Sequence, residues 1–214
     1  MYQLFRSILF RFDAEKVHYF VVGLLKLMVK FPPSRWIFRS MYHMEHPVLE
    51  REFIGLKFPN PVGLAAGFDK DALCVQGLSD LGFGFIEVGT LTPKAQPGNP
   101  KKRLFRLPMD QAIINRMGFN NPGSKKVAVT LERHFSSAGS PSVPIWANLG
   151  KSKRTELELA PSDYAASMDR LWKFCDVFVI NVSSPNTPNL RELQHDDALE
   201  SIVHACQEIN RIHA

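Results

Sequence analysis

Four short apolar runs recur along the chain, and each is followed by a stretch with helical periodicity. The apolar runs lie near residues 62–66, 85–89, 144–149 and 177–182. The helical stretches lie near residues 71–81, 122–135, 162–173 and 196–213. Strands that alternate with helices in this way predict an α/β fold in which parallel strands are joined by crossover helices.

The N-terminal region shows a different pattern, that of two short amphipathic helices within residues 3–30. Apolar residues form one stripe at helical spacing in each, and Asp13 is suited to cap the second helix. A proline pair at 32–33 is expected to end that helix, and residues 31–61 are expected to form a linker with a short hairpin at 53–58. A basic amphipathic pair is typical of a membrane-surface element, or of a helical hairpin packed on its own domain. The pattern leaves both open.

Composition places the chain among single-domain globular proteins. It has 214 residues, of which 45% are hydrophobic and 22% charged, enough for one sizeable core. The net charge of +5 favours an anionic ligand or an anionic membrane surface. The Lys and Arg residues are too dispersed to predict nucleic-acid binding, so no nucleic-acid partner is expected.

The three cysteines, Cys74, Cys175 and Cys206, have the spacing of neither a metal site nor a disulfide framework. We therefore expect no bound metal, and reduced thiols in a reducing compartment. No apolar run reaches the length of a membrane span, and Arg6 and Arg11 interrupt the apolar run that a signal peptide needs.

The segment 181–188 reads Asn-Val-Ser-Ser-Pro-Asn-Thr-Pro and follows the apolar run at 177–180. Its amides and hydroxyls therefore lie at the C-terminal tip of a strand, where (β/α)8 barrels keep their chemistry. An Asn side chain suits the carbonyl and N–H edges of a planar ligand, and a serine hydroxyl can move a proton. Asn, Ser and Pro are also ordinary turn residues, and the segment alone supports the two interpretations equally.

Three upstream runs end in similar polar tips. Parallel strands bring their C-terminal tips to one end of a barrel, which predicts that five polar side chains converge there. They are Lys70, Thr90, Asn148, Asn181 and Ser184. The structural alternatives are a surface lysine paired with Asp69 or Asp71, and asparagines that only complete turns.

Three segments resemble the signature segments of the dihydroorotate dehydrogenase family. They are 63–70 (Gly-Leu-Ala-Ala-Gly-Phe-Asp-Lys), 115–120 (Asn-Arg-Met-Gly-Phe-Asn) and 181–187. Their order and spacing also fit, and the likeness runs from about the first helix to residue 214. The resemblance implies a (β/α)8 barrel that binds FMN and oxidises dihydroorotate to orotate in pyrimidine biosynthesis.

Four strand–helix units are half of such a barrel, which takes about 250 residues. The resemblance implies a C-terminal half with a flavin-contacting lysine, an Asn-Thr substrate segment and a glycine-rich phosphate site. We therefore expect a truncated chain that is inactive by itself, with the activity belonging to the full-length protein. Residues 1–33 would be the N-terminal helical region, 34–61 the linker with its hairpin, and 62–214 the first half of the barrel.

The resemblance also implies roles for individual residues. Ser184 would be the base that takes a proton from the substrate, because the quinone-dependent class has serine here and the soluble class cysteine; from the residues alone, Ser183 competes with it. The implied substrate contacts are Lys70, Asn115, Arg116, Met117, Gly118, Phe119, Asn181 and Asn186. The implied cofactor contacts are Ala66, Gly67, Phe68, Asp69, Lys70, Thr90, Asn148 and Asn181.

The N-terminal helical extension is similar to that of the membrane-bound, quinone-using class. In that class a hydrophobic tunnel for the quinone lies between the helices and the flavin, and His18 and Arg106 occupy matching positions. The resemblance implies peripheral attachment to a membrane, on the cytoplasmic face of a bacterial inner membrane. The structural alternatives are a surface histidine on an amphipathic helix and an arginine held in an ion pair.

Two other functions stay open from sequence. One is an FMN barrel oxidoreductase that acts on a different ring, such as a dihydropyrimidine dehydrogenase domain, although the N-terminal helices and Ser184 argue against it. The other is a non-catalytic half-barrel that binds a partner or a second half, since an open barrel exposes its edge strands.

Overall fold

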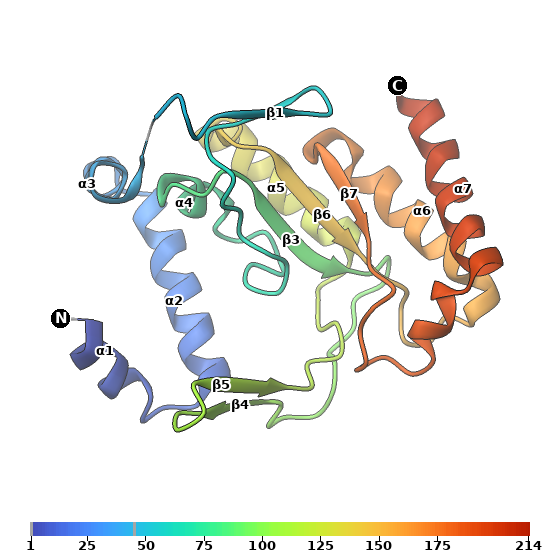
Figure 1. Cartoon of the computed structure of the whole chain (residues 1–214), viewed down its shortest axis with the longest axis horizontal. Coiled ribbons are helices and arrows are strands. Elements are labelled where there is room, and N and C mark those ends of the chain that lie inside the picture. Colours follow the sequence, from blue (N-terminus) through green and yellow to red (C-terminus); the bar gives the residue numbers. More distant parts are fainter. Residues whose placement is uncertain (1, 45) are drawn as a thin grey trace.

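A parallel sheet lies at the centre of the fold. The computed structural model describes residues 2–44 and 46–214. The sheet contains β3 (Ile86–Leu91), β6 (Ile145–Leu149) and β7 (Val177–Ile180), in that order (Figure 1). A parallel bridge between Leu64 and Ile86 places the preceding segment beside β3. Successive strand–helix units therefore lie side by side in chain order, as they do in the wall of a (β/α)8 barrel.

The segment 62–66 is not the full strand that its apolar pattern predicts, because it makes this one bridge. Its backbone still hydrogen-bonds to β3 and the residues just before it, from Val62 to Gly67. The ring of Phe85 lies where a Cβ atom on Gly63 would be, so only glycine lets the chain pass this close to that aromatic side chain. The other three predicted strands are present, with bounds within a few residues of those expected.

Helices cover the outer face of the sheet. In Figure 1, α5 (Ser124–Ala138) lies behind the sheet, and α6 (Ala160–Leu171) lies between β7 and α7 (Asp196–His213), which packs against α6. Large, fully buried side chains from strands and helices form the core between them: Leu78, Ile86, Leu91, Leu131, Ile145, Leu149, Tyr164, Leu171 and Ile202. Short 3-10 turns complete the connections at Leu157–Leu159, Trp172–Phe174 and Leu190–Gln194. The three cysteines are buried and free.

The helix predicted at 71–81 is shorter, α4 (Val75–Asp80). The reason is Asp69, whose carboxylate oxygens accept the backbone N–H groups of Leu73 and Cys74, each at 2.8 Å. These bonds hold residues 71–74 in a turn, where Ala72 takes a positive φ of 54°.

Three helices form the N-terminal region, where the pattern predicts two. They are α1 (Tyr2–Leu9), α2 (Ala14–Val29) and α3 (Pro32–Tyr42). Asp13 caps α2 as predicted, with its carboxylate accepting the N–H groups of Glu15 and Lys16 at 3.0 Å. The proline pair starts α3 rather than only ending α2, because proline is tolerated in the first turn of a helix, where its missing N–H is not needed.

Two hairpins flank the sheet. The first, β1 (Arg51–Phe53) with β2 (Leu56–Phe58), lies where a hairpin is expected. The second, β4 (Leu104–Leu107) with β5 (Ala112–Asn115), is absent from the sequence prediction. It extends below α2 in Figure 1, and α2 contacts both β4 and α4. The N-terminal helix therefore bridges the hairpin and the first strand–helix unit.

Ion pairs of two buried carboxylates, Glu15 and Asp80, attach the N-terminal helices to the rest of the molecule. Glu15 of α2 and Arg103 are each 5% exposed and form a two-pronged pair at 2.7 and 3.2 Å. Arg35 of α3 binds the fully buried carboxylate of Asp80 in α4 at 2.6 Å. In both cases an arginine neutralises the buried carboxylate and also donates hydrogen bonds to it, so the Glu15 pair holds α2 in place and the Asp80 pair holds α3.

Candidate active site

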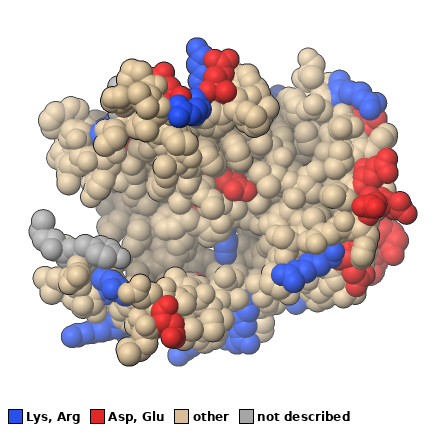
Figure 2. All heavy atoms as spheres, viewed as in Figure 1, with Lys and Arg blue, Asp and Glu red and all other residues tan. Residues whose placement is uncertain are grey.

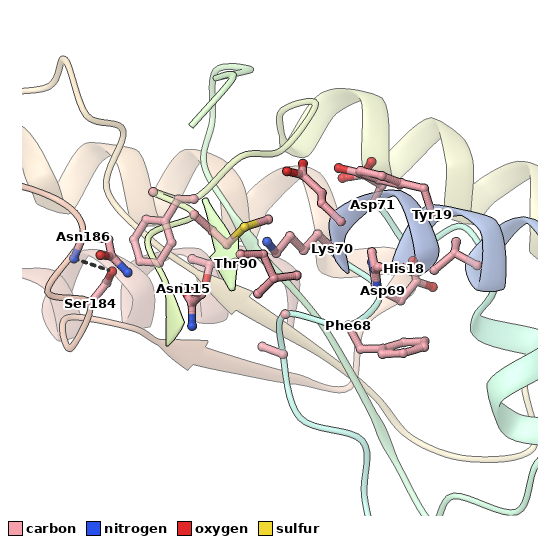
Figure 3. Close-up of a pocket in the computed structure, with 18 of the residues that line it drawn as sticks. His18, Tyr19, Phe68, Asp69, Lys70, Asp71, Thr90, Asn115, Ser184 and Asn186 are labelled. Carbon is pink, nitrogen blue, oxygen red and sulfur yellow. Dashed lines mark hydrogen bonds between the residues drawn. The ribbon is translucent and has the colours of Figure 1, made fainter. Parts of the chain in front are cut away.

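A cavity of about 420 Å³ lies between α2, the β4–β5 hairpin and the C-terminal tips of the sheet strands. Figure 2 shows the molecule hollowed in this region, with both acidic and basic side chains visible inside the hollow. In Figure 3, Ser184 and Asn186 lie at one end, His18 and Phe68 lie at the other, and Lys70 lies between them. The cavity therefore joins the strand-tip residues to the N-terminal helix.

Most of the residues that the sequence singles out line this cavity. They are His18, Ala66, Gly67, Phe68, Asp69, Lys70, Thr90, Asn115, Met117, Gly118, Phe119, Asn181, Ser184 and Asn186. Asn148, Arg106 and Arg116 are not among the lining residues. Asn148 lies directly behind the lining, whereas the two arginines point elsewhere.

The strand tips carry one connected hydrogen-bond network. Thr90 of β3 and Asn148 of β6 are 7% and 6% exposed, and Thr90 Oγ1 donates to Asn148 Oδ1 at 2.5 Å. Asn181, after β7, donates from Nδ2 to Asn148 Oδ1 at 2.9 Å and to Thr90 Oγ1 at 3.1 Å. The parallel register produces this meeting, because it places Asn148 beside both Gly89 and Val179. The predicted convergence of these tips is present.

The two serines after β7 lie in different surroundings. Ser184 lines the cavity, and its Oγ accepts the backbone N–H of Asn186 at 3.2 Å. Ser183 is exposed, and its Oγ donates to Asn181 Oδ1 at 3.0 Å. The geometry therefore distinguishes two residues that the sequence pattern leaves equivalent, and it favours Ser184 as the hydroxyl available to a ligand.

Lys70 is a cavity residue, not the surface ion-pair lysine of the structural alternative. Its Nζ donates to Asn120 Oδ1 at 3.0 Å, and Asn120 Nδ2 reaches the hydroxyl of Tyr19 in α2 at 3.4 Å. Burial, assisted by the positive charge of Arg103, lowers the pKa of Lys70 to about 8. Burial raises the pKa of the neighbouring Asp71 carboxyl. The cavity thus contains a cation whose charge is sensitive to pH just above neutrality.

The two residues expected at a quinone are placed differently. His18 lines the cavity, and its ring meets that of Phe68 edge-on at 5.1 Å. Burial, and then the charge of Lys70, lowers the pKa of His18 and favours its neutral form. Arg106 instead donates to the carbonyl of Phe12 at 2.8 Å and lies over the ring of Phe10 at 4.5 Å. In this arrangement Arg106 connects the hairpin to the chain before α2.

Arg116 also points away from the cavity, since its guanidinium donates to the carbonyl of Lys102 at 2.8 and 3.2 Å. It holds the end of β5 and leaves the cavity wall to its neighbours in the 115–119 segment. Asp69 lines the cavity, but both of its carboxylate oxygens are engaged by the turn before α4. These two side chains therefore support the site's loops in this structure.

Several lining residues have no signal in the sequence pattern. They include Glu15, Tyr19 and Val22 of α2, together with Asp71, Leu73 and Leu104. The α2 residues lie on a helix whose stripe indicates only amphipathicity, so no local pattern connects them with strand tips far along the chain. Only the docking of α2 over the strand tips brings them to the cavity.

Comparison with known proteins gives the family. The sequence profile described as dihydroorotate dehydrogenase matches residues 48–213. The chain belongs to the dihydroorotate dehydrogenase family. This confirms the resemblance of the three signature segments, and the mixed α/β structure fits a member of a TIM-barrel family.

Two curated relatives illustrate the similarity. The chain is 53% identical over 207 residues to the dihydroorotate dehydrogenase (quinone) of Christiangramia forsetii, covering 97% of this chain and 59% of the relative. It is 49% identical over 205 residues to that of Rhodococcus erythropolis, covering 96% and 56%. The chain thus spans somewhat more than half the length of these dihydroorotate dehydrogenases.

Solved structures agree with the family. The crystal structure of the Eimeria tenella dihydroorotate dehydrogenase in complex with ferulenol superposes with a TM-score of 0.81 at 41% identity, covering 93% of this chain and 51% of that chain. The ligand-free form from the same organism gives a TM-score of 0.72 at 42% identity, covering 87% and 52%.

Proposed function

We propose that the full-length protein oxidises dihydroorotate to orotate in pyrimidine biosynthesis, with FMN as cofactor and a quinone as final electron acceptor. One observation carries the proposal. Ser184, Lys70 and His18 line a single cavity, so a proton-accepting hydroxyl, a cation and the N-terminal helix meet at one place. The names of the relatives, dihydroorotate dehydrogenase (quinone), support the same reaction.

The residues at the strand tips fit a flat, polar cofactor such as FMN. Gly67 has a φ of +105°, and the space where its Cβ would lie is open. Ala66, Gly67 and Phe68 would form the wall beside the cofactor, with Asp69 holding their loop. Thr90, Asn148, Asn181 and Lys70 would supply polar contacts along its edge. When bound, FMN supplies hydride acceptance, which no side chain here can provide.

The substrate would lie between the cofactor and the 115–119 and 181–186 segments. Lys70 offers a cation to the dihydroorotate carboxylate. Asn115, Asn181 and Asn186 offer amides to its polar edges, and Met117, Gly118 and Phe119 form the remaining wall, with Arg116 securing that segment from outside.

Ser184 Oγ would take the proton from the acidic carbon of the substrate as its own hydroxyl proton passes to water in the cavity. The Asn186 N–H donated to its Oγ stabilises negative charge on that oxygen, which favours loss of the hydroxyl proton. Lys70 also lies in the cavity and adds positive charge to it.

The acceptor would approach beside α2. Neutral His18 can donate a hydrogen bond to a quinone carbonyl. Arg106 would have to release the Phe12 carbonyl before it could donate to the quinone.

Exposed apolar side chains cover the N-terminal helices, among them Leu4, Phe5, Ile8, Phe20, Leu24, Leu27 and Trp36. These and the basic residues around them support peripheral binding to an anionic membrane, which we assign to the cytoplasmic face of a bacterial inner membrane. Among the described helices, none is long and apolar enough to cross a bilayer.

Acceptor specificity tests the proposal. The purified full-length protein, assayed anaerobically with dihydroorotate, should turn over with a soluble quinone and not with NAD or fumarate. Robust turnover with fumarate and none with the quinone would contradict the assigned class. Failure to oxidise dihydroorotate with any acceptor would contradict the proposed reaction itself.

A further inference from the structure

Glu87 is a charged residue within β3 whose side chain binds two neighbouring segments. Its Oε1 accepts Asn148 Nδ2 at 2.7 Å, and its Oε2 accepts the backbone N–H of Ala66 at 3.3 Å. The side chain is partly buried, on the side of the sheet that carries the strand-tip network. A carboxylate here serves neither the apolar core nor the cavity lining, so its two hydrogen bonds are the feature to explain.

The carboxylate fixes the direction of every hydrogen bond that follows it, because an ionised Glu can only accept. Asn148 must present Nδ2 to Glu87, which turns its Oδ1 toward the tips of β3 and β7. That oxygen accepts Thr90 Oγ1 and Asn181 Nδ2. With Nδ2 so committed, Asn181 turns its Oδ1 to Ser183 and accepts both the backbone N–H at 3.1 Å and Oγ at 3.0 Å.

We propose that Glu87 is a positioning residue that sets the amide orientation of Asn148 and Asn181, and through Asn181 the turn at 183–184. An Asn amide has nearly the same shape in its two orientations, so packing alone discriminates weakly between them. Because the Glu87 carboxylate can only accept hydrogen bonds, it selects one of the two amide orientations at Asn148, where the hydrogen-bond network begins. The inference deepens the proposed function, because Ser184 and the asparagines form the assigned site, and it rests on that function.

A charge-swapped pair tests the proposal in the full-length protein. Glu87→Gln places an amide opposite the Asn148 amide, and Asn148→Asp places a carboxylate opposite Glu87. In the double variant the new amide at 87 donates to the new carboxylate at 148, which still accepts from Thr90 and Asn181. Every bond downstream of Glu87 is then retained, although the negative charge has moved. Glu132→Gln, at an exposed position on α5, is the matched control partner for Asn148→Asp.

We expect each single variant to lower the apparent Tm of the flavin-free protein by about 2–4 °C. Each should also slow flavin reduction by dihydroorotate by about tenfold, the effect of one lost charged hydrogen bond. The double variant should recover most of both losses, whereas Glu132→Gln combined with Asn148→Asp should recover neither. If a single variant is too unstable to purify, a double variant that folds counts as recovery of the lost stability.

Losses that simply add in the double variant, or a double variant that does not fold, would overturn the proposal, as would a Glu87→Gln protein indistinguishable from the parent. The flavin-free Tm separates this inference from the proposed function. A parent protein that does not reduce its flavin with dihydroorotate would refute the function, while the Tm comparison would still decide the part assigned to Glu87.

Discussion

The buried ion pair between Glu15 and Arg103 gives the sharpest stability prediction, because it attaches α2 over the site. Removing one partner of a buried pair costs about 3–5 kcal/mol, since the other charge is left unpaired. Arg103 keeps hydrogen bonds to the carbonyls of Pro97 and Asn99 at 2.6 and 2.9 Å, so the lower figure applies. Glu15→Ala should therefore favour undocking of α2 by about 3 kcal/mol, or about 100-fold.

Hydrogen–deuterium exchange of α2 amides measures that undocking, with α7 as the internal reference in the same sample. Lys16→Ala is the matched control, because Lys16 is exposed on the same helix and alanine is a good helix former. Equal acceleration in both variants, or none in Glu15→Ala, would mean that apolar contacts alone hold α2 and would refute the reasoning.

The ion pair also predicts a pH dependence. The hydrogen bond from Arg103 is the main cause that lowers the pKa of Glu15 below its ordinary value. A carboxyl whose pKa is lower in the folded state stabilises the fold above its ordinary pKa, and loses that contribution as the pH falls through the lowered value. After correction for the intrinsic slowing of amide exchange in acid, the protection of α2 amides should therefore fall at acidic pH in the parent and change less in Glu15→Ala.

Three further predictions concern the site and the surface. Ser184→Ala should slow flavin reduction by dihydroorotate by about 10²-fold or more while FMN stays bound, and a larger loss in Ser183→Ala would reverse the choice of base. Lys70 is cationic only below its pKa of about 8, so kcat/KM for dihydroorotate should fall as the pH rises above that value. Lys70→Arg should move this inflection to higher pH, and an unmoved inflection would exclude Lys70 as its source. Leu24→Glu should weaken co-sedimentation with anionic phospholipid vesicles, whereas Val129→Glu, on α5 and similarly exposed at 47% against 50%, should not; equal losses would argue against a membrane face on α2.

The sequence predicts the sheet better than the segments around it. Three parallel strands follow from apolar runs that have no competing local structure. The β4–β5 hairpin is missed because its four-residue strands are too short to show alternation clearly. The helix α3 is missed because Pro32 and Pro33 are interpreted as a stop signal, whereas proline also suits the first helical turn.

For the site, the sequence identifies residues at strand tips and misses those that depend on tertiary docking. Thr90, Asn148 and Asn181 meet because parallel register brings strand ends together, which a strand pattern predicts. Tyr19 reaches the cavity only because α2 docks over it. Glu87 has no local signature, since a glutamate in a strand is interpreted as solvent-facing until the fold places it beside Asn148.

We propose that the cavity joining Ser184, Lys70 and α2 is a dihydroorotate-oxidising flavin site. Anaerobic mixing of the full-length protein with dihydroorotate in a stopped-flow spectrophotometer tests it most directly. We expect visible flavin absorbance to bleach in a single turnover and a quinone to restore it. Ser184→Ala should slow the bleaching while retaining the flavin. A purified protein that binds FMN but keeps its flavin oxidised in excess dihydroorotate would contradict the claim.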